Sequence, residues 1–244
     1  WCWDETFATA SAVALAQIDQ EQESLVKGAK IAHIYSGTWG RTVAMLKSLG
    51  FKVSITIAAH DRFVSRREHE ALGLGFPYPH LVEKKLWQRY IEGYRLADVI
   101  ICPSSIAAET VRAYGPEFEE KDIRIIPHGT DLPETVAPLP KHFVCGYLGS
   151  FGADKGVRYL LEAWKKLNYT DATLILAGRD STSSWARHLI DCFGGGNIQL
   201  RGWVDNPSDF YNSLSLYVQP SATEGFGIEV TEAMAHDRPV ICSL

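Results

Sequence analysis

Short apolar runs rich in β-branched residues alternate along this chain with segments whose apolar residues recur at helical spacing. Nearly continuous apolar strands separated by helices are typical of parallel sheets that are buried on both faces. The pattern therefore predicts an α/β fold with doubly wound, mainly parallel sheets. The expected strands are Lys30–Tyr35, Lys52–Ala58, Asp98–Cys102, Ile123–Ile126, His142–Leu148, Ala172–Ala177, Ile198–Leu200, Leu216–Gln219 and Val240–Cys242, and the expected helices are Thr6–Lys27, Arg41–Leu49, Val82–Ala97, Ser105–Tyr114, Val157–Leu167 and Gly227–Ala235.

A proline-rich segment interrupts this alternation at Asp131–Lys141, where three prolines fall within the eleven residues DLPETVAPLPK. Such a stretch without periodicity is typical of a linker. We therefore expect two Rossmann-like domains, residues 1–135 and 136–244, with a ligand bound in the cleft between them.

The composition is that of a globular protein and narrows the function classes. Of the 244 residues, 46% are hydrophobic and 22% charged, which excludes a disordered chain. The net charge is −5, and neither the part before Lys141 (15 basic against 18 acidic side chains) nor the rest (9 against 11) is basic. A nucleic-acid partner is therefore not expected. No apolar run approaches the ~20 residues that span a bilayer, so we expect no membrane-spanning helix.

The five cysteines are scattered and include no CxxC pair and no histidine at metal-ligand spacing. Cys102, Cys145 and Cys242 lie in apolar runs, where a buried, inert thiol is expected. This usage favours a reducing compartment, the cytoplasm, and gives no reason to expect a metal site.

The first candidate site is the turn GSFGADKG at residues 149–156, between the strand ending at Leu148 and the helix beginning at Val157. A glycine-rich turn lets backbone amides approach an anion at a helix N-terminus, and Lys155 adds a charge for a phosphate oxygen. An ordinary strand-to-helix turn with a solvated lysine explains this segment equally well.

The second candidate site follows the strand Leu216–Gln219 and reads PSATEGFG, with a helix after it. Gly225 and Gly227 allow the amides to cradle a diphosphate at the helix start. Glu232 then suits a vicinal diol such as ribose, and Glu224 suits further sugar hydroxyls. A helix-surface role for Glu232 and a helix-dipole role for Glu224 fit the spacing as well.

Residues 197–243, which contain EGFG and EAMA with seven residues between Glu224 and Glu232, resemble the signature region of the retaining GT-B glycosyltransferases of family 4. The turn GSFGADKG, the segment IPHGTD at Ile126–Asp131, ITIAAHD at Ile55–Asp61 and LADVIICPS at Leu96–Ser104 also resemble parts of that family, so the likeness covers most of Lys30–Leu244. The resemblance implies a GT-B fold, with an acceptor-side first domain and a second domain that binds the nucleotide sugar.

The resemblance also implies roles for individual residues. Glu232 would hold the ribose of the donor and Glu224 its hexose, while Lys155 would neutralise the departing phosphate and His60 would contact the transferred sugar; Glu224, Lys155 and His60 are thus the expected catalytic residues. The family transfers the sugar with retention, and the departing phosphate is thought to act as the base, without a protein nucleophile or a metal. The expected donor-binding residues are Gly149, Ser150, Lys155, Glu224, Gly225, Phe226, Gly227, Ile228 and Glu232.

The sequence departs from the family pattern at three positions. Ser150 stands where the family often has Arg, so one cation at the diphosphate is missing. Asp237 stands where the helix usually ends with Gly, and Asp tolerates the left-handed conformation expected there. His128 replaces the usual Asn of the hinge segment, where a packing role is favoured. Trp203 lies where family members meet the nucleotide base.

Several alternatives follow from the same residues. The family's first strand with its Gly-rich loop is expected before Trp1, and its closing helices after Leu244, so the chain is expected to bind nucleotides and to transfer sugar weakly or not at all. The rival function is a nucleotide-sugar-binding module without transferase activity; an epimerase or phosphorylase of GT-B architecture fits the motifs less well. The expected acceptor is a sugar, a glycan or a lipid-linked sugar.

The basic stretch Asp61–Arg95 is interpreted as a core-packed, solvated helix, with peripheral membrane contact as the alternative.

Overall fold

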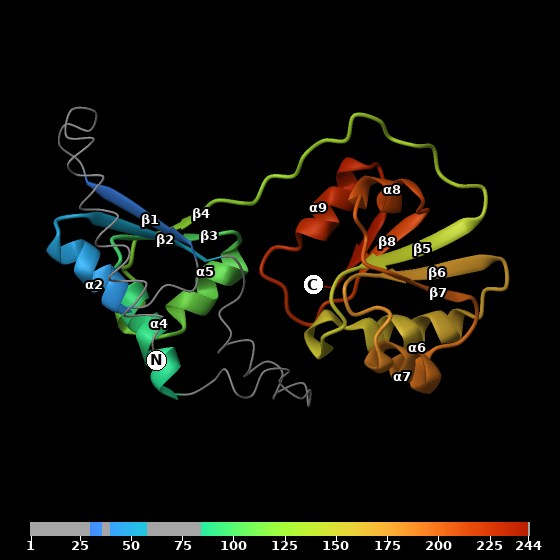
Figure 1. The fold of residues 1–244 in the computed structure, drawn as a ribbon, viewed down its shortest axis with the longest axis horizontal. Helices are drawn as coiled ribbons and strands as arrows, with labels where there is room; N and C mark the ends of the chain where they lie inside the picture. The colour runs from blue at the N-terminus through green and yellow to red at the C-terminus, as the bar shows by residue number, and fades with distance from the viewer. Residues whose placement is uncertain (1–29, 36–39, 58–83, 244) are drawn as a thin grey trace. The chain divides into compact units, whose positions relative to one another are not determined.

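The computed structural model describes residues 30–35, 40–57 and 84–243. These residues form two compact units that divide between Pro127 and His128, and each unit has a parallel sheet of its own (Figure 1). The expected fold class is confirmed in both units. The predicted linker follows the division and belongs to the second unit, and the cleft between domains stays a prediction. The expected helix Thr6–Lys27 and the candidate His60 lie outside the described residues.

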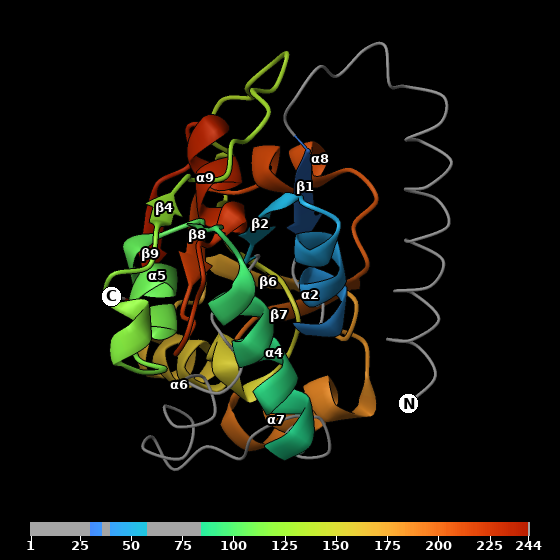
Figure 2. The ribbon, with the colours of Figure 1, turned by 90° about the vertical axis from the view of Figure 1, so that its left-hand side faces the viewer.

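The first unit contains a four-stranded sheet in the order β1-β2-β3-β4, in which all neighbours are parallel. Its strands are β1 (Ile31–Tyr35), β2 (Lys52–Thr56), β3 (Val99–Cys102) and β4 (Ile123–Ile125), and its helices are α2 (Gly40–Ser48), α4 (Lys84–Leu96), α5 (Ser105–Arg112) and the 3-10 helix η2 (Pro116–Phe118). Helices α2 and α4 lie side by side (Figure 2). Tyr94 of α4 is buried in the core, with Tyr90 and Ile91 packed against it, which confirms the core-packed interpretation for this part of the basic stretch.

The carboxylate of Asp98 joins three elements of the first unit. It accepts hydrogen bonds from Lys47 Nζ of α2 at 2.6 Å, from the Val53 amide of β2 at 2.7 Å and from Lys52 Nζ at 3.3 Å. Burial acts to raise the pKa of Asp98, but these donors lower it to about 2. The ionised carboxylate therefore stabilises the start of β3 against α2 and β2.

The second unit contains a five-stranded parallel sheet in the order β7-β6-β5-β8-β9. Its strands are β5 (Phe143–Leu148), β6 (Ala172–Ala177), β7 (Ile198–Gly202), β8 (Leu216–Gln219) and β9 (Val240–Cys242), and its helices are η3 (Ala153–Lys155), α6 (Val157–Leu167), α7 (Ser184–Phe193), α8 (Pro207–Asn212) and α9 (Ile228–Ala235).

Both faces of this sheet are covered, α6 and α7 lying on one and α8 and α9 on the other (Figure 1). The fully buried strand β6 has the sequence ATLILA, which is apolar except for Thr173. Leu174 and Leu176 belong to the core beneath α6 and α7, whereas Ile175 and Ala177 belong to the core beneath α8 and α9. A strand packed on both sides therefore has a nearly continuous run of apolar residues.

The strand order of the second unit reverses between β5 and β8. Chain connections run from β5 outward through β6 to β7 on one side, and through β8 to β9 on the other. In open α/β sheets, ligands bind beyond the carboxyl ends of the strands at such a switch point. The two turns singled out in the sequence follow these two strands.

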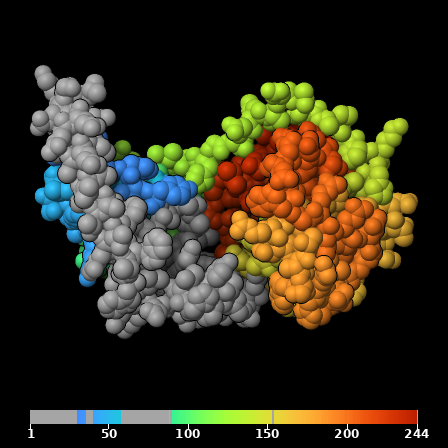
Figure 3. Space-filling model, viewed as in Figure 1, coloured from blue at the N-terminus to red at the C-terminus, as the bar shows by residue number. Residues whose placement is uncertain are grey.

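The start of the second unit, in lime green, runs along the red and orange surface of the C-terminal part of the chain (Figure 3). The Ala137 amide donates to Asn212 Oδ1 at 2.9 Å, and its carbonyl accepts from Arg238 Nη2. Arg238 is 3% exposed and also donates to the carbonyls of His236 at 2.7 Å and Leu214 at 3.0 Å. The buried guanidinium thus fixes this segment to the sheet.

Two local expectations differ from the structure. Helices α7 and α8 were not predicted, because α8 has only six residues and α7 buries only Ala186 and Leu189. Cys102 and Cys145 are buried as expected, and burial raises the pKa of these thiols to about 11 and about 12. Cys242, however, is exposed, because β9 pairs only with β8 among the described strands. No helix in the described residues is both long and apolar enough to cross a membrane.

Candidate functional site

The two predicted turns pack against each other at the switch point. The Ala222 amide donates to the Asp154 carbonyl at 2.7 Å, which joins the turn after β8 to η3 in the turn after β5. Gly156 has a φ of +66°, and a Cβ atom built there would lie 1.8 Å from the Pro220 carbonyl oxygen. Only glycine allows this approach. The structure therefore brings the two candidate sites together into one.

Backbone amides of both turns are left available for an anion. Within the described residues, the amides of Ser150, Phe151 and Gly152 in the first turn have no hydrogen-bond acceptor, nor do those of Phe226, Gly227 and Ile228 in the second. Phe226 and the N-cap Gly227, which is left-handed at φ 77°, precede α9, and Ile228 is its first residue. Amides grouped at helix N-termini form an anion site.

Two side chains donate hydrogen bonds to carbonyl oxygens of the first turn. Tyr147 of β5 donates its hydroxyl to the Ser150 carbonyl at 2.5 Å, and Trp185 of α7 donates Nε1–H to the Phe151 carbonyl at 3.1 Å. Phe151 is itself buried, with its ring edge-on to Tyr147. These two hydrogen bonds stabilise the conformation of the turn. The Ser150 residue is exposed and supplies no cation.

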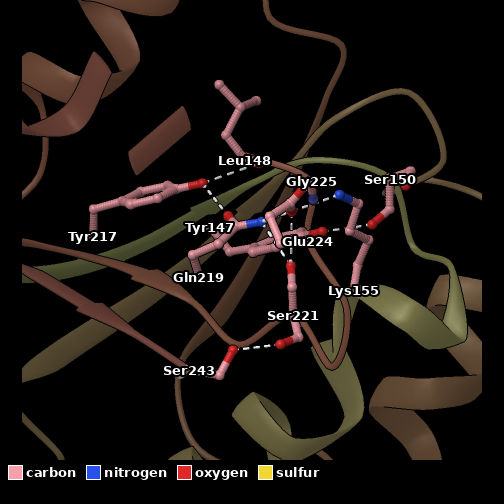
Figure 4. A network of polar contacts seen from close by, with 10 residues as sticks. All are labelled: Tyr147, Leu148, Ser150, Lys155, Tyr217, Gln219, Ser221, Glu224, Gly225 and Ser243. Carbon is pink, nitrogen blue, oxygen red and sulfur yellow. Dashed lines mark hydrogen bonds and ion pairs between the residues drawn. The ribbon is translucent and has the colours of Figure 1, made fainter. Parts of the chain in front are cut away.

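Lys155 and Glu224, both predicted site residues, form an ion pair (Figure 4). Lys155 Nζ lies 2.8 Å from Glu224 Oε2, and the two side chains are 20% and 30% exposed. Burial acts to lower the pKa of Lys155, but the charge of Glu224 and its hydrogen bond raise it. The ammonium is therefore charged at neutral pH. The ion pair thus joins the two turns that carry the available amides.

Three groups besides Lys155 donate hydrogen bonds to the Glu224 carboxylate. Its Oε2 atom also accepts from Ser221 Oγ at 3.2 Å and from Gln219 Nε2 at 3.3 Å, while Oε1 accepts from the Gly225 amide at 3.2 Å (Figure 4). Each carboxylate oxygen carries two lone pairs. Oε2 is thus saturated, whereas Oε1 retains a lone pair for a ligand hydroxyl.

Glu232, which lies on α9, is oriented by Tyr211 of α8. The Tyr211 hydroxyl donates to Glu232 Oε2 at 2.8 Å. Burial is the main cause that raises the pKa of Tyr211 far above its usual range, so the phenol remains a donor. One carboxylate oxygen is then engaged by the protein, and both retain acceptor capacity for a diol.

Sequence reasoning missed a third carboxylate, Glu229, in the first turn of α9. Burial raises its pKa first, and the neighbouring carboxylates Glu224 and Glu232 act in the same direction, against its own amide and Lys155. An acidic residue in a helix's first turn is common as a dipole partner. No signal in the sequence alone set Glu229 apart from that ordinary use.

The remaining singled-out residues also lie in the second unit. His128 packs edge-on against Phe226, with ring centroids 5.3 Å apart, so the expected packing role is confirmed. Asp237 adopts the expected left-handed conformation at φ 55°. Trp203 is 64% exposed beyond β7, with Arg179 5.7 Å from its ring centroid. Among the described residues, no group of three His, Cys, Asp or Glu is placed to hold a metal ion.

Comparison with known proteins extends these observations over nearly the whole chain. The model of glycosyltransferase family 4 matches residues 9–134, and that of glycosyl transferases group 1 matches residues 142–244. The capsular polysaccharide biosynthesis glycosyltransferase CapM of Staphylococcus aureus is 31% identical over 107 residues, which are 42% of this chain and 28% of that protein. The lipopolysaccharide core biosynthesis mannosyltransferase LpcC of Rhizobium leguminosarum bv. viciae is 30% identical over 145 residues, 52% of this chain and 41% of that protein.

Solved structures share the fold. Sucrose-phosphate synthase from Thermosynechococcus elongatus aligns with a TM-score of 0.70 at 19% identity, over 98% of this chain and 60% of that one. Anabaena HepE in complex with UDP and glucose aligns with a TM-score of 0.64 at 16% identity, over 86% of this chain and 58% of that one. The chain therefore spans between about a quarter and three fifths of the length of these relatives. Its two units have the GT-B fold, and because a family model matches more than half of its residues, the chain belongs to glycosyltransferase family 4.

Proposed function

We propose that this protein moves a hexose from a nucleoside-diphosphate sugar to an acceptor hydroxyl, with retention at the anomeric carbon. One observation carries the proposal: two turns at the switch point of the second unit present six amides without acceptors in the described residues, next to Lys155. A diphosphate matches that arrangement in charge and in hydrogen bonding.

Other side chains of the second unit match the remaining parts of the donor. Glu232, oriented by Tyr211, accepts from the ribose hydroxyls, and Glu224 Oε1 accepts from a hydroxyl of the hexose. The exposed ring of Trp203 receives the base. His60, which lies outside the described residues, contacts the transferred sugar in this proposal.

In the reaction, the bond between the anomeric carbon and the phosphate oxygen breaks, and a bond to the acceptor oxygen forms on the same face. The acceptor's proton goes to the departing phosphate, and the reaction needs no protein nucleophile. The charge on that phosphate grows in the transition state, so Lys155 and the amides stabilise it more than they stabilise the bound donor. No metal is required in this scheme, and donor binding is expected to be unchanged by EDTA.

The names of the relatives support the acceptor class. CapM and LpcC are named for capsular polysaccharide and lipopolysaccharide core biosynthesis. We therefore propose a glycan or a lipid-linked sugar as acceptor, with peripheral membrane contact where the acceptor is lipid-linked.

A thermal-shift panel of UDP-, GDP- and ADP-hexoses tests donor binding, with the Glu232→Ala and Lys155→Ala variants alongside. Each variant is expected to bind more than tenfold more weakly, since a hydrogen bond to a charged group is worth about 1.5–3 kcal/mol. Unchanged affinity in both folded variants would refute the site. Nucleotide release in the presence of acceptor glycans then separates a transferase from a binding module, which would bind the donor without turnover.

A further inference from the structure

The buried amide side chain of Gln219 is hydrogen-bonded to Glu224, the candidate sugar-binding carboxylate. Gln219 is the last residue of β8, is 3% exposed, and reaches Glu224 Oε2 at 3.3 Å and Ser221 Oγ at 2.9 Å through its NH2 group (Figure 4). One amide hydrogen is donated to Glu224 and the other to Ser221, whose own hydroxyl hydrogen is donated to Glu224. The side chain supports Glu224 directly and through the serine.

The orientation of this amide is set by Tyr217, two residues earlier on the same strand. The Tyr217 hydroxyl lies 2.5 Å from Gln219 Oε1 and 3.2 Å from the Leu148 carbonyl oxygen, and its one hydrogen is directed to the nearer acceptor, the amide oxygen (Figure 4). Burial keeps this phenol protonated by raising its pKa well above the usual range, so it donates and the amide oxygen accepts. The flipped amide would instead set its oxygen 3.3 Å from the Glu224 carboxylate, where two acceptors repel.

Ordering Gln219 therefore orders Glu224. With Oε2 engaged by Gln219, Ser221 and Lys155, the carboxylate has one preferred rotation, and Oε1 is left beside the Gly225 amide. A carboxylate held in this way presents one lone pair in a fixed direction, which favours a sugar hydroxyl in the matching position.

We infer that Gln219 is a positioning residue that aims Glu224 at the hexose of the donor, so that it sets the preference for a nucleotide sugar over the sugar-free nucleotide. This inference rests on the proposed function. It assigns Gln219 no contact with the diphosphate, which binds the amides of the two turns and Lys155. The loss of Gln219 should therefore affect recognition of the sugar and leave recognition of the diphosphate intact.

Calorimetry on the whole chain tests this with two ligands: the hexose nucleotide that stabilises the wild type most in the UDP, GDP and ADP panel, and its sugar-free diphosphate. Gln219→Met keeps the unbranched shape without the amide. We expect it to bind the nucleotide sugar about tenfold more weakly and the diphosphate within twofold of wild type. Gln199→Met is the matched control, because Gln199 is an exposed residue on β7 of the same sheet, and both affinities should be unchanged.

Equal weakening of both ligands, or no change in either, would overturn the inference while leaving donor binding by the wild type in place. If Gln219→Met does not fold, Tyr217→Phe decides the matter. It keeps the amide but removes its orienting hydroxyl, so a loss of about threefold confined to the nucleotide sugar is expected, and an equal effect on both ligands contradicts the inference. A wild type that binds neither ligand refutes the proposed function itself.

Discussion

The ion pair between Lys155 and Glu224 leads to a prediction in which two ligands respond by different amounts. In Glu224→Gln, the ammonium loses its carboxylate partner at 2.8 Å but keeps its place at the amide cluster. A phosphate oxygen bound to the same ammonium would lie within about 5.6 Å of the carboxylate oxygen, twice that hydrogen-bond length. The carboxylate therefore opposes the phosphate, and its removal should favour binding of the sugar-free diphosphate.

The magnitude follows from this distance. Two unit charges about 5.6 Å apart repel by roughly 3 kcal/mol at an effective dielectric constant of 20. Solvent reaches both side chains, which are 20% and 30% exposed, so we expect roughly 1–2 kcal/mol after screening, or about five- to thirtyfold tighter diphosphate. The nucleotide sugar gains the same amount but loses about 1–1.5 kcal/mol, because its hydroxyl meets a neutral amide oxygen in place of a carboxylate.

The assay is isothermal titration calorimetry at pH 7 and low salt, with the matching nucleoside diphosphate and nucleotide sugar as ligands. The diphosphate should bind the Glu224→Gln variant more tightly than the wild type, while the preference for the nucleotide sugar over the diphosphate falls about tenfold. A variant that changes both affinities by the same factor would refute the assignment of Glu224 to the sugar. Weaker diphosphate binding would refute the assignment of Lys155 to the phosphate.

Three further predictions concern charged groups in each unit. Glu229→Gln should raise the melting temperature at pH 7 but not at pH 4, because a raised carboxyl pKa makes the native state the stronger proton binder, so its stability falls as pH rises above about 4.5; equal shifts at both pH values would count against this. Asp98→Asn should cost about 1–2 kcal/mol above pH 4, and this difference should shrink as pH falls from 3.8 towards about 2 in acid-unfolding titrations of the first unit. Arg238→Met should leave the carbonyls of His236, Leu214 and Ala137 without their donor and speed hydrogen exchange around residue 137 at least tenfold; unchanged exchange would show that the guanidinium does not fix this segment.

The sheets and the two turns could be predicted because they depend on local patterns. The predicted strands Ala172–Ala177, Leu216–Gln219 and Val240–Cys242 agree with the structure residue for residue. Each is a largely apolar run bounded by polar or turn residues, and a parallel strand such as Ala172–Ala177, which is buried on both faces, is expected to be nearly continuous in apolar residues. The glycines and Lys155 marked both turns, because an anion site at a helix start needs close approach of the backbone.

The contacts that orient the site could not be predicted, because they join distant parts of the chain. Lys155 and Glu224 are 69 residues apart and meet only because β5 and β8 are neighbours in the sheet. Tyr211 and Glu232 are 21 residues apart, and Tyr211 lies on the short helix α8, which no periodicity reveals. Gln219 ends an apolar strand, where a polar side chain is expected to face solvent, yet it is buried against Glu224.

The central claim is that the turns after β5 and β8 form a single site for the donor diphosphate. Titration of the 15N-labelled chain with a nucleoside diphosphate, followed by amide NMR, tests it most directly. We expect the largest shifts on amides of both turns, with one dissociation constant: Ser150, Phe151, Gly152, Phe226, Gly227 and Ile228. Lys155→Ala should weaken binding at all of them together. Saturable binding that shifts amides elsewhere in the chain, or shifts only one of the two turns, would contradict it.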